Sequence, residues 1–146
     1  MKKFIVFVFF IAVAFSCQMK IASTDVPKIN GYWEIEKVIF SDGKQKEYGF
    51  NEAYDYFEIK ENKGIRKKVM PQLVGSFLVN DAFEKIEIKN TDGKYLLHCS
   101  TAFSKWNEEI VTLSDKELVL LNASKIEYHY KRAEAINITG NGKKTQ

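Results

Sequence analysis

The chain has 146 residues, of which 45% are hydrophobic and 28% charged, so it is neither disordered nor too short to form one domain with its own core. The formal net charge is +3 at pH 7, and without Lys2 and Lys3, which precede an apolar run, it falls to +1. Such a domain lacks the excess of positive charge that is typical of nucleic-acid-binding proteins, and we expect no nucleic acid as a partner. Eleven Phe and seven Tyr against two Pro favour β-strands.

The N-terminus has the organisation of a signal peptide. Two lysines are followed by an apolar run of 12 residues from Phe4 to Phe15. In a helix such a run spans about 18 Å, whereas the hydrocarbon core of a bilayer is roughly 30 Å thick. We therefore interpret residues 1–16 as a cleaved signal sequence and not as a membrane span.

Residues 14–17 read Ala-Phe-Ser-Cys, which resembles a bacterial lipobox. The resemblance implies a lipoprotein: a diacylglycerol on Cys17 and a further acyl chain, such as palmitate, on the new amino terminus. The small residues Ala14 and Ser16 also fit ordinary signal peptidase, which stays an alternative. Residues 18–20 lack acidic sorting signals, which favours the outer membrane facing the periplasm.

Polar residues 17–30 show no periodicity and are expected to form a tether. After residue 31 the pattern alternates between strands and turns. The predicted strand segments are 31–40, 54–60, 65–70 with 73–79, 83–89, 94–101, 106–113, 117–121 and 125–132. The alternation changes phase near Lys37, which indicates a bulge. A less regular stretch, 45–53, is long enough for a lid-like loop.

This pattern predicts an all-β fold: an eight-stranded antiparallel up-and-down barrel over residues 31–132. Consecutive hairpins favour closure, because a closed barrel leaves no free strand edge. No linker divides the chain, and residues 133–146 are expected to form a flexible tail. The interior of an eight-stranded barrel is either filled by side chains or holds one small ligand.

Two parts of the sequence are similar to lipocalins. Gly31-Tyr32-Trp33 forms a G-x-W at the start of the first strand, and residues 110–120 lead into Tyr128-His-Tyr-Lys-Arg132. Together they resemble the lipocalin-like domains of bacterial envelope lipoproteins. The resemblance implies that Arg132 packs over Trp33 and closes one barrel end by a cation–π contact. A second internal lipocalin motif and the helix after the barrel are absent from the sequence.

No catalytic or metal-binding pattern is present. His98 and Cys99 are neighbours in a strand, so their side chains point to opposite faces and cannot activate each other. Asp55 and Glu58 are separated in the same way, and His129 has no second histidine nearby. We therefore expect no enzyme, no metal and no cofactor. If Cys17 is acylated, Cys99 is a lone thiol that packs as a small hydrophobic residue.

Aromatic residues supply the candidates for a binding site. The ligand-pocket candidates are Trp33, Ile35, Phe57, Phe77, Tyr128 and Tyr130. Two hypotheses follow: a barrel that binds a small hydrophobic ligand inside, or a filled barrel that contacts or inhibits another envelope protein. An empty interior volume favours the first hypothesis, and a packed interior favours the second.

Overall fold

The structure is a computed structural model that describes residues 20–71, 77–79 and 81–133. One short 3₁₀-helix, η1 (Ser23–Ile29), precedes the strands. The strands are β1 (Gly31–Ile39), β2 (Gln45–Glu47), β3 (Tyr54–Lys60), β4 (Lys63–Pro71), β5 (Phe77–Val79), β6 (Glu84–Thr91), β7 (Lys94–Ser100), β8 (Lys105–Leu113), β9 (Glu117–Asn122) and β10 (Glu127–Arg132).

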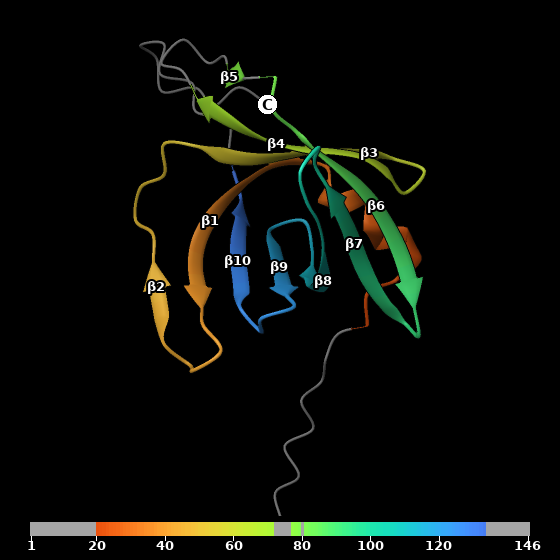
Figure 1. Cartoon of the computed structure of the whole chain (residues 1–146). Coiled ribbons are helices and arrows are strands. Elements are labelled where there is room, and N and C mark those ends of the chain that lie inside the picture. Colours follow the sequence, from red (N-terminus) through yellow and green to blue (C-terminus); the bar gives the residue numbers. More distant parts are fainter. Residues whose placement is uncertain (1–19, 72–76, 80, 134–146) are drawn as a thin grey trace, which may run out of the picture.

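Eight of these strands form a closed antiparallel barrel (Figure 1). The neighbours run β10-β9-β8-β7-β6-β4-β3-β1, and pairing of β1 with β10 closes the ring. The predicted up-and-down barrel is thereby confirmed. The short strands β2 and β5 lie outside the ring and pair with β1 and β4, respectively.

Strand β1 bends where the sequence pattern changes phase. Its register with β10 shifts between Ile35 and Lys37, which confirms the predicted bulge. The first half of β1 pairs with β3, and the second half pairs with β2. The bend thus allows β1 to change its neighbour on one side from β3 to β2, while it stays paired with β10 on the other side.

The core follows from the alternation of side chains along each strand. The largest fully buried side chains are Trp33, Phe57, Ile29, Leu97, Leu118, Leu120, Val69 and Cys99. All but Val69 belong to one contiguous core cluster, so side chains fill the part of the barrel that these residues line.

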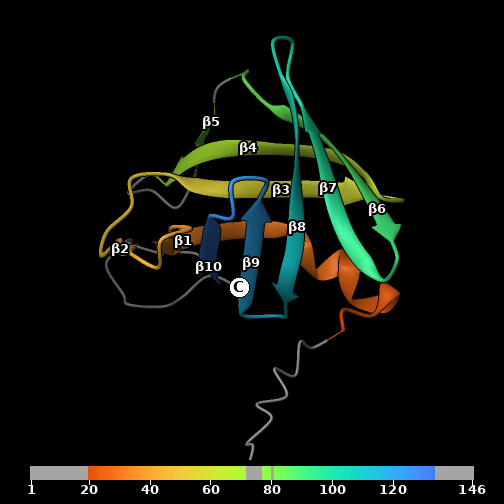
Figure 2. The ribbon, with the colours of Figure 1, turned by 60° about the horizontal axis from the view of Figure 1, so that its bottom comes forward.

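The start of the domain differs from the predicted tether. Residues 23–29 form η1, which lies at one end of the barrel (Figure 2) and buries Val26 and Ile29. Ile21 also packs against the core. The spacing of three between Val26 and Ile29 places both on one side of a 3₁₀-helix, a period that a search for α-helical or strand patterns does not detect. We call this end the closed end.

The opposite, open end carries the β1–β2, β2–β3, β4–β6, β7–β8 and β9–β10 connections. The stretch 45–53, expected as a lid-like loop, contains β2 and is tied to β1. The Asn51 side-chain amide donates hydrogen bonds to Glu34 Oε1 at 3.0 Å and to the Ile35 carbonyl at 2.8 Å. The predicted signal peptide, Cys17 and the tail beyond Ala133 lie outside the described residues.

Candidate functional site

The closed end is sealed by Trp33 and Arg132. The Arg132 guanidinium lies 3.9 Å from the centroid of the Trp33 ring. It also donates to the carbonyl oxygens of Asn30 and Lys28, both at 2.5 Å, while the Trp33 indole donates to the Ile29 carbonyl at 2.7 Å. These contacts attach η1 to the first and last strands, so this end offers no entrance to the barrel.

Gly31 is required at this seal. Its backbone has φ +110°, a conformation that residues with a side chain rarely adopt. A Cβ there would lie 2.9 Å from Nη1 of Arg132. The glycine of the G-x-W motif therefore leaves the space that the guanidinium occupies.

Towards the open end, the barrel interior is charged rather than apolar. Arg66 on β4 forms a bidentate pair with Glu108 on β8, at 2.8 and 3.1 Å, and a second ion pair with Glu84. Trp106 donates its indole N–H to Glu108 at 2.9 Å. Burial alone would lower the pKa of Arg66, but the hydrogen bonds that it donates to Glu108 and the charges of both carboxylates raise this pKa above its ordinary value.

A second polar group stands beside this network. Lys68 lies 2.7 Å from the buried Asp55 carboxylate. Burial, followed by the charge of Asp55, raises the pKa of the Tyr130 hydroxyl well above its ordinary value, so Tyr130 stays a neutral donor. The Lys68–Asp55 pair and the ion pairs of Arg66 together form a layer of paired charges between the apolar core and the open end.

Above this layer is a depression of about 240 Å³ at the barrel mouth. It is lined by Asp55, Arg66, Lys67, Lys68, Ala82, Phe83, Glu84 and Thr101. The mouth therefore combines one exposed aromatic ring with several charged groups.

The open end also carries the exposed apolar residues. Among the described residues, the exposed large hydrophobic side chains are Phe40, Phe50, Met70, Phe83 and Phe103. All five lie in or next to the connections at that end. The two ends of the barrel thus differ: one is sealed, and the other presents aromatic side chains to solvent.

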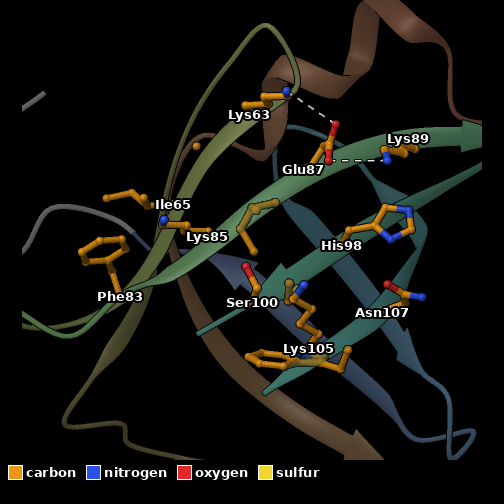
Figure 3. Close-up of a pocket in the computed structure, with 14 residues that line it drawn as sticks. Lys63, Ile65, Phe83, Lys85, Glu87, Lys89, His98, Ser100, Lys105 and Asn107 are labelled. Atoms are coloured by element: carbon orange, nitrogen blue, oxygen red, sulfur yellow. Dashed lines mark ion pairs between the residues drawn. The ribbon is translucent and has the colours of Figure 1, made fainter. Parts of the chain in front are cut away.

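A larger hollow lies on the outer wall of the barrel (Figure 3). Its volume is about 650 Å³, and its lining comes from β4, β6, β7, β8 and the residue before β6. The side chains drawn include Lys63, Lys85, Lys89 and Lys105, with Glu87 as the acidic member. We call this hollow the outer groove.

The predicted ligand-pocket residues gather in the core. Trp33, Phe57 and Tyr130 are 0%, 1% and 7% exposed, and Ile35 and Tyr128 are partly buried against the same cluster. Phe77 lies in β5, but its side chain is outside the described part of the structure. These aromatic residues therefore contribute packing beneath the charged layer.

The charged layer is not among the candidates that the sequence analysis selects. The alternation of inward and outward side chains along a strand could have identified this layer. Arg66 lies directly opposite the buried Phe57 and therefore points inward, whereas Lys67 lies opposite Tyr56 and points outward. An arginine at an inward strand position indicates a buried ion pair.

The structure places the neighbouring titratable residues His98 and Cys99, and likewise Asp55 and Glu58, in different surroundings. Cys99 is buried, and burial followed by the charge of Glu108 raises its thiol pKa to about 12. His98 lies on the opposite face, in the outer groove. Asp55 is buried, whereas Glu58 is exposed.

No group of three or more His, Cys, Asp or Glu side chains among the described residues could hold a metal ion. Over the same residues, no helix has the length and apolar character needed to cross a bilayer.

The fold agrees with the family model that the sequence matches. A family model described as a lipocalin-like domain matches residues 29–120, and the chain belongs to this family. A solved structure of a lipocalin-like protein from Bacteroides uniformis is similar over 73% of this chain and 99% of that chain, with 12% identity and a TM-score of 0.48. No curated protein sequence matches the chain.

Proposed function

We propose that the protein is a non-catalytic binding module of a bacterial envelope, which takes a small hydrophobic molecule at the open end of its barrel. Acyl chains on Cys17 hold it to the membrane, on the periplasmic face of the outer membrane. The observation that carries the proposal is the contrast between the sealed end and the five exposed apolar side chains at the other.

The mouth depression is where the ligand binds. Its 240 Å³ lies somewhat below the roughly 300 Å³ at which small-molecule pockets begin, so part of the ligand stays outside. Phe83 offers an apolar surface, and Lys68 offers an exposed cation that is already paired with Asp55. A compact hydrophobic molecule with one polar end fits this lining.

A second candidate is the filled barrel that binds a protein. The packed core, in which Trp33, Leu118 and Leu120 are completely buried, favours this candidate. The exposed aromatic residues at the open end would then anchor a partner, since such side chains dominate binding energy at interfaces. The two candidates use the same end and differ in the size of the bound molecule.

Native mass spectrometry of the full chain, extracted from envelopes in a mild detergent, separates these candidates. The ligand hypothesis expects a discrete added mass that is lost on unfolding. Ala82→Trp, which fills the mouth, should abolish it, whereas Ala123→Trp, in the exposed β9–β10 turn, should keep it. A bare chain mass that persists after incubation with total membrane lipid would reject the ligand hypothesis, and cross-linking would then identify the protein partner.

A further inference from the structure

The outer groove is formed by a regular array of side chains on the solvent face of four strands. One row crosses the wall as Lys63, Glu87, His98 and Asn107, and the next as Ile65, Lys85, Ser100 and Lys105. With strands about 4.8 Å apart, each row is roughly 14 Å long. The groove is therefore an extended surface with two parallel lines of functional groups, as Figure 3 shows.

The charge of this surface is strongly unbalanced. Four lysines face a single carboxylate, and Glu87 is shared by Lys63 at 3.7 Å and Lys89 at 3.5 Å. Lys85 and Lys105 have no ion pair within the described part of the chain. Lys85 is on β6 and Lys105 is on β8, and Ser100 on the intervening strand β7 lies directly opposite each of them in the sheet register. The backbones of the two lysines thus lie about 10 Å apart, on either side of Ser100.

Neutral polar and aromatic groups complete the lining. Ser100 and Asn107 supply a hydroxyl and an amide that can both donate and accept hydrogen bonds. Phe83, which is 49% exposed, stands at one end of the groove. An exposed aromatic ring beside hydrogen-bonding groups suits the apolar face and the hydroxyls of a sugar ring.

We propose that the outer groove binds an anionic saccharide, with Lys85 and Lys105 contacting its carboxylate or sulfate groups. The inference is independent of the ligand proposed for the barrel mouth, although Phe83 borders both depressions.

Other anionic partners fit this surface less well. An acidic peptide would gain main-chain hydrogen bonds only at a free strand edge, but β4, β6, β7 and β8 have partners on both sides here. A lipid would require an apolar channel for its acyl chains, whereas the apolar side chains that line the outside of the wall are mainly Phe83 and Ile65. The linear, polar form of the groove favours a sugar chain.

The test is calorimetric titration of the full chain in non-ionic detergent with three probes: trigalacturonate, a sulfated heparin tetrasaccharide and neutral maltotriose. One of the two anionic sugars should bind, and maltotriose should not. Lys85→Ala/Lys105→Ala should weaken binding about tenfold or more and reduce its dependence on salt, because two charge-assisted contacts are lost. The stronger of the two anionic probes identifies carboxylate or sulfate as the recognised group.

The matched control is Lys46→Ala/Lys116→Ala, which removes the same charge from exposed positions elsewhere. It should bind as the unchanged protein does, and urea unfolding should show that both variants are folded. Equal loss in both double variants, or no binding of either anionic sugar, would overturn the proposal. So would binding of phosphatidylglycerol vesicles through Lys85 and Lys105 without sugar binding. Ala82→Trp should retain sugar binding, which separates this site from the mouth.

Discussion

At the scale of single residues, the Arg66–Glu108 pair is the most sensitive point of the barrel interior. Both side chains are about 10% exposed or less, and removing one partner leaves the other buried and unpaired. We expect Glu108→Leu to lower the free energy of unfolding by about 3–5 kcal/mol. Arg66→Met/Glu108→Leu should recover most of this loss. Urea unfolding measures both, and a loss below about 1 kcal/mol in the single variant would contradict this view of the pair.

Cys99 gives a second prediction at this scale, tested in Cys17→Ser so that it is the sole thiol. Its pKa is raised from 9.0 to about 12 in the folded protein, so on raising the pH the unfolded chain loses its proton first. The free energy of unfolding should therefore fall as the pH rises from about 9 to about 12. At pH 8, a thiol reagent such as DTNB should label Cys99 only in unfolding concentrations of urea. Rapid labelling of the folded protein would show that the thiol is accessible.

At the scale of elements, η1 is an integral part of the barrel. Ile29 is completely buried in the core, and we expect Ile29→Ala to cost about 2–5 kcal/mol in urea unfolding. Lys28→Ala is the control within the same helix, because it removes only an exposed ion pair with Asp25 at 2.9 Å. It should cost less than about 1 kcal/mol. Similar losses of unfolding free energy in both variants would mean that the packing of η1 against the core does not stabilise the barrel.

The sequence could predict the strands, their antiparallel order and the bulge near Lys37, because these depend on alternation within single segments. The 3₁₀-helix escaped prediction because only Val26 and Ile29 mark its buried side. The charged layer could not be predicted from the sequence for a different reason. Glu84 and Glu108 are 18 and 42 residues away from Arg66 in the sequence, and only the closed sheet brings the three side chains together. Local sequence patterns therefore predict the strands of the barrel better than the ion pairs between side chains from distant strands inside it.

At the scale of the whole molecule, the short segment before the barrel would set the orientation of an acylated protein on a membrane. Lys20 and Ile21 already lie beside the β6–β7 turn at the closed end. If Cys17 is acylated, only two residues separate it from Lys20, so the two positions are at most roughly 10 Å apart. The closed end should then face the lipid, and the open end should face away from it.

Site-specific labels test this orientation in the acylated protein. A fluorophore at Thr91→Cys, near the closed end, should be quenched by spin-labelled lipid headgroups. One at Ser124→Cys, at the open end, should not. A 20-residue Gly/Ser insert after Met19 should remove the difference, because a flexible linker of that length spans about 25 Å. Equal quenching without the insert would refute the orientation.

The closing contacts of the barrel also set an order of folding. Arg132 binds the main chain of Asn30 and Lys28, which are 102 and 104 residues away, and β10 completes the ring with β1. Closing so long a loop costs conformational entropy that is recovered only when the last strand is in place. Until residue 132 has been synthesised, the chain exposes unpaired edges on β1 and β9. We therefore expect a chain truncated before β10 to aggregate, because nothing else on the ring can cover those two edges.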